Sequence, residues 1–276
     1  MGSDFSIISD FYNAFIGVIN GGFVSIQPDV NYLMSAMIVI TIIMAAITTF
    51  VWGDVETVTK GLFLKIPLIG FFSYLVENWE TVTGTIVSSF DTIGLKGGGA
   101  TLTAHQFESQ PEAVMAIGLN LFTGCLDVIS PYMNYWDFFT YFITILVYVV
   151  AGLVVIVAFA VITVQIFITF IEFKLIALAA WILIPFGIWT RTNFLSERAL
   201  GYTFSVGIKM LVLALIVSIG QALFSDITLS EEPNINNALS VAIAAILLMA
   251  TAIFAPSYAG ALIGGGPQTG LGTLAA

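Results

Sequence analysis

Residues 138–170 read FFTYFITILVYVVAGLVVIVAFAVITVQIFITF and contain no charged side chain. About 20 apolar residues in a helix are enough to cross the hydrocarbon core of a bilayer. This uncharged run is therefore longer than a single perpendicular crossing requires. It predicts that the chain spans a membrane as an α-helix.

The composition of the whole chain favours the same class. Of 276 residues, 59% are hydrophobic and 9% are charged, and the net charge is −10. Soluble domains carry about 25% charged residues, so the charges here are too few to cover a water-facing surface. The hydrophobicity excludes a disordered chain, and a nucleic-acid-binding surface would need clustered Lys and Arg. We predict an all-α fold, a polytopic membrane helical bundle.

Four further segments have the apolar length of a membrane span: residues 30–52, 61–79, 203–224 and 238–256. The second of these is weaker, because Lys65 and Glu77 lie within it, although Lys65 near one end can reach the membrane surface. Residues 172–189 form an ambiguous segment that carries two charges near its start. The prediction is about five transmembrane helices plus a re-entrant or sixth helix.

Two regions flank these spans. Residues 1–29 place apolar side chains near helical spacing, which predicts an amphipathic periplasmic segment. This segment could lie on the membrane, contact a partner or pack as the start of the domain. Its acidic start lacks the basic region of a signal peptide, so we expect no cleaved leader. Residues 257–276 are uncharged and rich in Gly, which is typical of a flexible tail.

The positive residues predict a topology, because cytoplasmic loops near span ends are enriched in Lys and Arg. Lys60 and Lys65 lie in or near the link between the two helices of the first transmembrane hairpin, residues 30–79. They place this link in the cytoplasm and the N-terminus in the periplasm. Residues 80–137 then lie in the periplasm, consistent with five acidic side chains after Glu80 against one Lys. Residues 138–256 form the core transmembrane region.

Two topologies stay open for the second half. In the favoured one, residues 172–189 dip into the membrane and return, or lie along the interface, so that residues 172–202 and the C-terminus are cytoplasmic. In the other, residues 172–189 cross the membrane completely, which exports Arg191 and Arg198 and leaves the tail outside.

The periplasmic residues 80–137 are predicted to be helical. A stripe at helical spacing, ended by Gly94 and the glycines at 97–99, offers a partner surface made of Val82, Ile86, Phe90 and Ile93. A second helix starts near Glu112 and is stopped by Ser130-Pro131. The two helices, joined by a glycine hinge, would form a docking surface, or they would simply pack on the bundle.

Charged side chains at membrane depth are costly and suggest function. A charged cluster is predicted at the cytoplasmic side of the core, made of Glu172, Lys174, Arg191, Glu197, Arg198 and Lys209. We hypothesise that Glu172 pairs with Lys209 or Arg198 across a helix contact. The alternative is that Glu172, Lys174 and Lys209 only reach to lipid headgroups.

Motifs for catalysis were sought in the sequence and are absent from it. The chain has no phosphate-binding Gly-rich loop with Lys, no nucleophile elbow and no zinc-binding His-Glu-x-x-His helix. The single His105 and the single Cys125 cannot supply a metal site of several such ligands. We expect no catalytic residues, no metal, no cofactor and no enzymatic activity.

The stretch 165–187, QIFITFIEFKLIALAAWILIPFG, resembles the TrbL family of conjugative transfer proteins. The similarity includes Glu172 and the series Pro185, Phe186 and Gly187, which would be structural. It continues through Glu197-Arg198 and through Gly207 to Lys209.

The resemblance implies a polytopic inner-membrane subunit of a bacterial type IV secretion system, with no catalysis of its own. Family members assemble as a ring, fivefold by resemblance, and support DNA and protein export and pilus growth. The implied partners are the stalk-tip subunit and pilin on the periplasmic side, export ATPases at the cytoplasmic face, membrane lipids and, transiently, DNA.

A stand-alone transporter or channel for small solutes is the alternative. Such a protein would be expected to show polar residues at mid-bilayer or broken spans in paired halves. The central spans here are nearly free of charge, and no internal repeat stands out.

Overall fold

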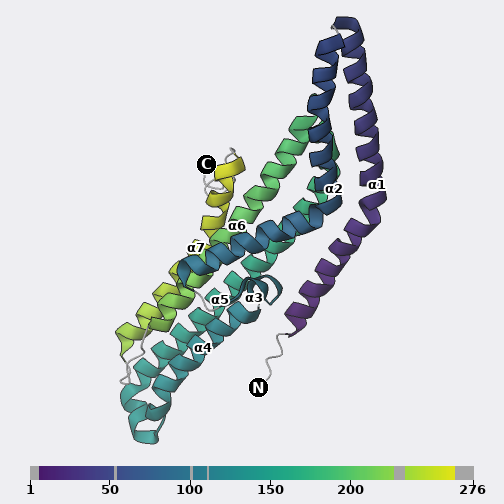
Figure 1. Cartoon of the computed structure of the whole chain (residues 1–276). Coiled ribbons are helices and arrows are strands. Elements are labelled where there is room, and N and C mark those ends of the chain that lie inside the picture. Colours follow the sequence, from purple (N-terminus) through teal and green to yellow (C-terminus); the bar gives the residue numbers. More distant parts are fainter. Residues whose placement is uncertain (1–5, 53–54, 100–101, 111, 227–233, 265–276) are drawn as a thin grey trace, which may run out of the picture. The chain divides into compact units, whose positions relative to one another are not determined.

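The computed structural model of the chain describes residues 6–52, 55–99, 102–110, 112–226 and 234–264. Within these ranges the chain is almost entirely helical and contains no β-strand, which confirms the all-α class (Figure 1). The α-helices are α1 (Ser6–Trp52), α2 (Val55–Gly98), α3 (Ala104–Ser109), α4 (Glu112–Ile129), α5 (Tyr135–Leu183), α6 (Asn193–Asp226) and α7 (Ile235–Gly264). Two short 3-10 helices, η1 (Ser130–Tyr132) and η2 (Ile184–Ile188), follow α4 and α5.

Five segments of the described chain are long and apolar enough to cross a membrane. They are Asp10–Ile47, Glu112–Tyr132, Asp137–Ile188, Asn193–Phe224 and Ile235–Leu262. Four of them overlap the strongest predicted spans. The fifth is α4 rather than α2, which contains the predicted span 61–79 with Lys65 and Glu77.

The helix starting at Glu112 is found, and η1 ends it at Ser130-Pro131 as predicted. The predicted boundary between residues 29 and 30 lies inside α1, which continues through Pro28 without a break. Lys60 and the C-terminal half of the tail lie where the structure describes no side chain.

Helix α5 does not end at Glu172. It continues as one helix to Leu183, over 49 residues, which at ~1.5 Å per residue is about 74 Å against a hydrocarbon core of about 30 Å. The chain leaves the helix only at η2, where Pro185 lies in the first turn. Residues 172–183 therefore extend α5 instead of starting a separate segment, and the path of residues 172–189 relative to the membrane stays a prediction.

The chain divides into two compact units. The first contains the described residues within Met1–Asn13, Val87–Phe170 and Ile208–Ala276. The second contains Ala14–Ile86 and Ile171–Gly207. Helices α1, α2, α5 and α6 each contribute residues to both units.

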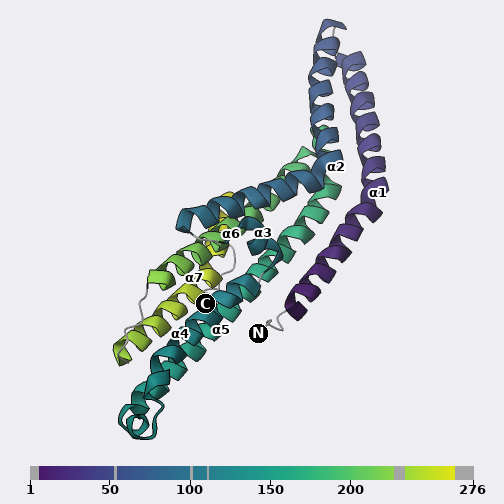
Figure 2. The same cartoon turned by 60° about the horizontal axis from the view of Figure 1, so that its bottom comes forward.

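The core of the first unit is formed where α4 lies antiparallel to α5 (Figures 1 and 2). Glycines permit this close approach, because a Cβ on Gly118 would meet the Phe159 side chain and one on Gly152 would meet Phe122. Helix α7 completes the cluster through Ala238. The buried residues Cys125, Ile129, Ile145 and Tyr148 lie in the same cluster.

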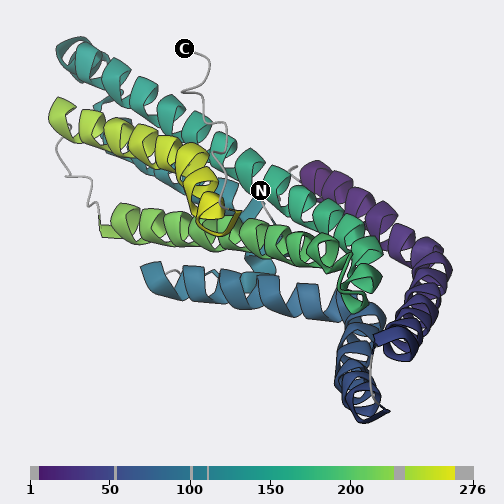
Figure 3. The same ribbon diagram turned by 90° about the horizontal axis from the view of Figure 1, so that it is seen from above.

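In the same unit, α6 lies between α7 and the part of α2 after Val87 (Figure 3). Helix α2 passes through Gly94 and ends in the glycine run at 97–99, the second part of its predicted stop. Helix α2 continues to Gly98, and the chain leaves the helix at Gly99, whose φ of 77° is the left-handed conformation common after helix ends. Gly94 and Gly98 lie inside the helix, where the lack of a side chain lets α6 pack closely.

In the second unit, α1 and α2 run side by side (Figures 1 and 2). Helix α2 has a kink at Asn78, whose backbone is not helical. The Asn78 amide donates to the carbonyl of Tyr74 at 3.0 Å, one turn earlier in the helix. The kink lies next to Trp79, which is almost completely buried.

Candidate functional site

The glycine face of α2 packs closely against α6 in the first unit. A Cβ on Gly94 would meet the carbonyl oxygen of Leu211, and a Cβ on Gly98 would meet Ser218. Ser218 donates from its Oγ to the carbonyl of Gly94 at 3.1 Å. Gly94 and Gly98 have the four-residue spacing of small residues that brings helices together in membranes. This contact fixes α2 against α6.

The buried face of α2 contains a charged residue that the sequence analysis did not single out. The residues that face inward recur every three or four positions: Trp79, Thr83, Val87, Asp91, Gly94 and Leu95. Asp91 has an exposure of 0%. Its four-residue spacing from Val87 and Leu95 is the sequence signal for this position, which is not part of the predicted stripe of Val82, Ile86, Phe90 and Ile93.

Two other side chains surround Asp91. Glu108 of α3 lies close enough for its charge to act on the Asp91 carboxyl. Tyr12 of α1 is 3% exposed and lies within reach of both carboxyl charges. Burial first, and then the charge of Glu108, raises the pKa of Asp91 to about 9. The site thus favours one shared proton over two negative charges.

A reciprocal pair of tryptophan hydrogen bonds joins α2 to α5 in the second unit. Trp79 Nε1 donates to the carbonyl of Ala177 at 2.7 Å, and Trp181 Nε1 donates to the carbonyl of Val76 at 2.8 Å. Both indoles are buried. Phe23 of α1 packs on Trp181 with ring centroids 5.4 Å apart. We call Trp79 and Trp181, with their two acceptors, the tryptophan clamp.

The series Pro185, Phe186 and Gly187 forms the turn after α5. Gly187 lies against the ring of Phe72 on α2, and a Cβ at this position would overlap that ring. Thr192 donates from its Oγ1 to the carbonyl of Phe186 at 2.8 Å. Lys65 of α2 donates to Thr190 Oγ1 at 3.2 Å. The structural role expected for these three residues is consistent with their position in this turn.

The predicted charged cluster is divided between the units. Lys209 is buried in the first unit, whereas Glu172, Lys174, Arg191, Glu197 and Arg198 belong to the second. Glu172 and Lys174 are half-buried on α5, and each has a contact of its own. Arg191, Glu197 and Arg198 are exposed. The pairing of Glu172 with Lys209 or Arg198 stays a prediction.

Local contacts organise the exposed part of this cluster. The side-chain amide of Asn193 donates to Glu197 Oε1 at 3.0 Å in the first turn of α6. The guanidinium of Arg198 lies 5.6 Å from the centre of the Phe194 ring, within range of a cation–π contact.

The predicted partner surface on α2 is open to contact. Val82, Ile86 and Phe90 are half-buried, and Ile93 is 57% exposed. A longer apolar surface, which the sequence analysis did not identify, follows α5 in the first unit. Its exposed members follow one another at alternating steps of four and three residues, with one step of seven between Val157 and Val164. They are Phe139, Ile143, Leu146, Val150, Leu153, Val157, Val164 and Ile168. We call this surface the α5 stripe.

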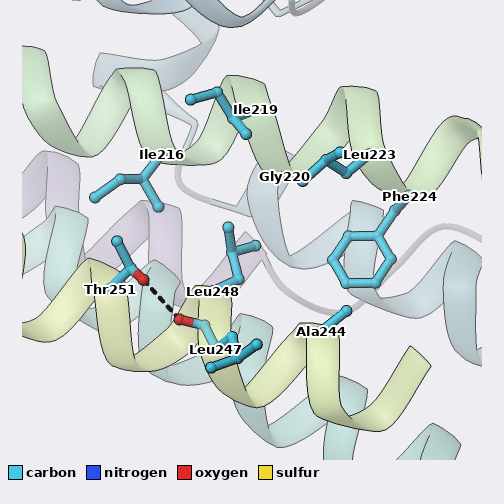
Figure 4. Close-up of a pocket in the computed structure, with 9 residues that line it drawn as sticks. All are labelled: Ile216, Ile219, Gly220, Leu223, Phe224, Ala244, Leu247, Leu248 and Thr251. Carbon is cyan, nitrogen blue, oxygen red and sulfur yellow. Dashed lines mark hydrogen bonds between the residues drawn. The ribbon is translucent and has the colours of Figure 1, made fainter. Parts of the chain in front are cut away.

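An apolar groove of about 310 Å³ lies between α6 and α7 (Figure 4). It is lined on α6 by residues from Ile216 to Phe224 and on α7 by residues from Ala244 to Thr251. The Thr251 hydroxyl donates a hydrogen bond to the carbonyl of Leu247 at 2.8 Å, so it adds little polarity to the groove. A second groove of about 240 Å³ lies between α7 and the α5 stripe. Both grooves suit lipid chains or apolar side chains.

Among the residues that the structure describes, no group of three or more His, Cys, Asp or Glu side chains is arranged to hold a metal ion. The arrangement of the described side chains is that of a helix-packing scaffold with apolar outer faces and a buried carboxyl, Asp91, beside the half-buried Glu108.

A comparison with protein families supports a function for this scaffold. A family model described as TrbL/VirB6 plasmid conjugal transfer protein matches residues 5–255. A search of curated proteins finds no significant match.

Proposed function

Because this chain belongs to the TrbL/VirB6 family of plasmid conjugal transfer proteins, we propose that it is a channel and platform subunit of a type IV secretion system. Membership makes it a component of a conjugal transfer apparatus, and its five long apolar helices make it a multi-pass membrane protein. The proposal adds that it sits in the bacterial inner membrane and supports DNA and protein export and pilus assembly without catalysis of its own. The match over residues 5–255 is the observation that carries it.

The α5 stripe supports assembly with further subunits. Its members recur at steps of four and three residues, the spacing of a helix that packs along another helix, and all are large apolar side chains. A lone copy would expose this surface to lipid. In a ring of copies, fivefold by family resemblance, the stripe or the grooves beside α7 would contact a neighbouring subunit, and lipid would cover the rest.

The charged and half-buried surfaces suggest where the other partners bind. The proposed cytoplasmic face includes the exposed Arg191 and Arg198, which suits contact with export ATPases and the positive-inside preference. The proposed periplasmic surface on α2, around Phe90 and Ile93, suits the stalk-tip subunit and pilin. Transient contact with DNA is part of the same proposal.

The test is to delete the gene for this chain in donor cells and to measure DNA transfer and pilus formation. We expect both to be lost and to be restored by the wild-type chain. The variant Glu172→Ala, present at normal levels, should restore them poorly, whereas the exposed control Val18→Ala should restore them fully. Unchanged transfer after deletion would contradict the proposal and would direct attention to solute uptake.

A further inference from the structure

Asp91 is a charged residue in a place that ordinarily accepts only apolar or small side chains. It lies on the inward face of α2 with Val87 and Leu95, both of which are buried. It is itself 0% exposed, and neither of its carboxyl oxygens has a hydrogen-bond donor. Burying an ionised carboxylate without a donor is energetically costly, so such groups take up a proton instead.

In the described part of the unit, the charged neighbour that acts on Asp91 is another acid, Glu108. Helix α3 brings Glu108 and, one turn away, the exposed His105; α1 brings Tyr12, whose ring packs on Phe167 and Phe170 of α5. Helix α6 packs on the same face of α2 at Gly94 and carries the buried Lys209. Lys209 has a contact of its own but donates to neither oxygen of Asp91.

A single proton resolves this arrangement. Two ionised carboxylates can only repel each other, and neither can donate a hydrogen bond. If one of them is protonated, its hydroxyl can donate to the other, as two carboxyls that share one proton do. The buried Asp91 carboxyl then gains a hydrogen bond to Glu108. The preference of Asp91 for its protonated form has the same origin.

Helix α3 depends on this contact more than a longer helix would. It has only six residues and a capping box in which Thr103 and Gln106 bond each other, and isolated helices of this length are unstable in water. Its inward side chains are Phe107, which is completely buried, and Glu108. The order of α3 therefore requires that both side chains stay packed against the rest of the unit.

We propose that Asp91 and Glu108 form a proton-binding site whose single shared proton holds α3 in place on α2. When the proton leaves, the buried Asp91 carboxylate and the half-buried Glu108 carboxylate repel each other, and α3 separates from α2. The site goes beyond the proposed transfer function and does not rest on it, since it is a property of the isolated chain.

Amide hydrogen exchange of α3 in the purified full chain, in lipid nanodiscs, tests this site. The protection of Phe107 and Gln110, whose amides bond within α3, is measured from pH 5 to pH 9 and corrected for the intrinsic exchange rate. If release of one proton undocks α3, protection falls by on the order of tenfold per pH unit between the undocked and docked pKa of Asp91. We expect at least a tenfold fall between pH 6 and pH 8.

Two variants and a control make the test specific. Asp91→Asn and Glu108→Gln each replace one carboxyl by a neutral amide that can donate to its partner, so protection should vary by less than about threefold over the same range. Asp127→Asn, which changes an acid on α4, should keep the wild-type slope. Flat protection in the wild type, or an unchanged slope in both amide variants, would overturn the proposal. So would protection that follows Na⁺ or K⁺ concentration at fixed pH, which would indicate a bound cation instead.

Discussion

Replacing Gly94 by Ala tests the close contact between α2 and α6. A Cβ at this position would meet the carbonyl oxygen of Leu211, the Cβ of Ala214 at 2.8 Å and the backbone nitrogen of Leu215 at 3.1 Å. Two of these atoms belong to the backbone of a buried helix, which cannot move aside as a flexible side chain can. Overpacking of this kind costs about 1–3 kcal/mol, and backbone contacts favour the upper end.

The matched control is Gly84→Ala in the same helix. Nothing lies within 4 Å of a Cβ at Gly84, so this variant only gains the helix preference of Ala over Gly, about 1 kcal/mol. Gly94→Ala gains the same amount and loses about 3 kcal/mol, a net destabilisation of roughly 2 kcal/mol. The two variants should therefore differ by about 3 kcal/mol.

Thermal unfolding in detergent, followed by the fluorescence of the five tryptophans, measures this difference. At about 2–4 °C per kcal/mol for a protein of this size, Gly94→Ala should unfold roughly 6–12 °C below Gly84→Ala. A Gly94→Ala protein that is as stable as the Gly84→Ala protein would refute the contact between α2 and α6.

Three further predictions follow from other contacts. Trp181→Phe removes the hydrogen bond to the Val76 carbonyl and should lower the free energy of unfolding in detergent by about 0.5–1.5 kcal/mol plus lost packing; an unchanged denaturation curve would argue against the tryptophan clamp. Gly187→Val places a branched side chain against the Phe72 ring and should lower both the unfolding temperature and the amount of the protein in membranes. The control Gly70→Val, which has open space around it, should lower both quantities less than Gly187→Val does. The folded chain keeps on Asp91 a proton that the unfolded chain releases near pH 4, so the stability is full below that pH and falls as the pH rises toward about 9. The unfolding temperature should therefore decline between pH 5 and pH 9 in the wild type and much less in Asp91→Asn. Equal slopes in the two proteins would contradict the protonation of Asp91.

The sequence was sufficient for the class of the fold and for several helices. The hydropathy of residues 138–170 predicts the helix there, and the Pro and Ser-Pro positions predict the ends of α4. Both are local signals. These signals decide where apolar helices form, because the length of an apolar run and the residues at its ends act over a few turns.

The sequence was insufficient where tertiary packing outweighs local preference. Gly94 disfavours a helix by about 1 kcal/mol, yet α2 continues through it because α6 approaches there too closely for any side chain. Glu172 suggested the start of a new segment, but α5 carries it as a half-buried residue within one helix. The tryptophan clamp joins residues about 100 positions apart, so no local pattern could reveal it.

The candidate site was predicted unevenly for the same reason. Pro185 and Gly187 were expected to be structural from the family resemblance, and both lie in the turn after α5. Asp91 was counted only as one of several acids in a segment expected to face the periplasm. Its four-residue spacing from the buried Val87 and Leu95 is the signal that indicates its burial. Only the fold brings its partner Glu108 close to it.

The most direct test of the platform claim is to photo-cross-link the α5 stripe in donor cells. A photoreactive residue at Val157, which is 58% exposed, should form adducts with a second copy of the chain or with another transfer subunit, identified by mass spectrometry. The same residue at the neighbouring Ala158, which is 1% exposed, should react only within the chain. Adducts with lipid alone, at Val157 and at the other positions of the stripe, would contradict the claim that this surface assembles the complex.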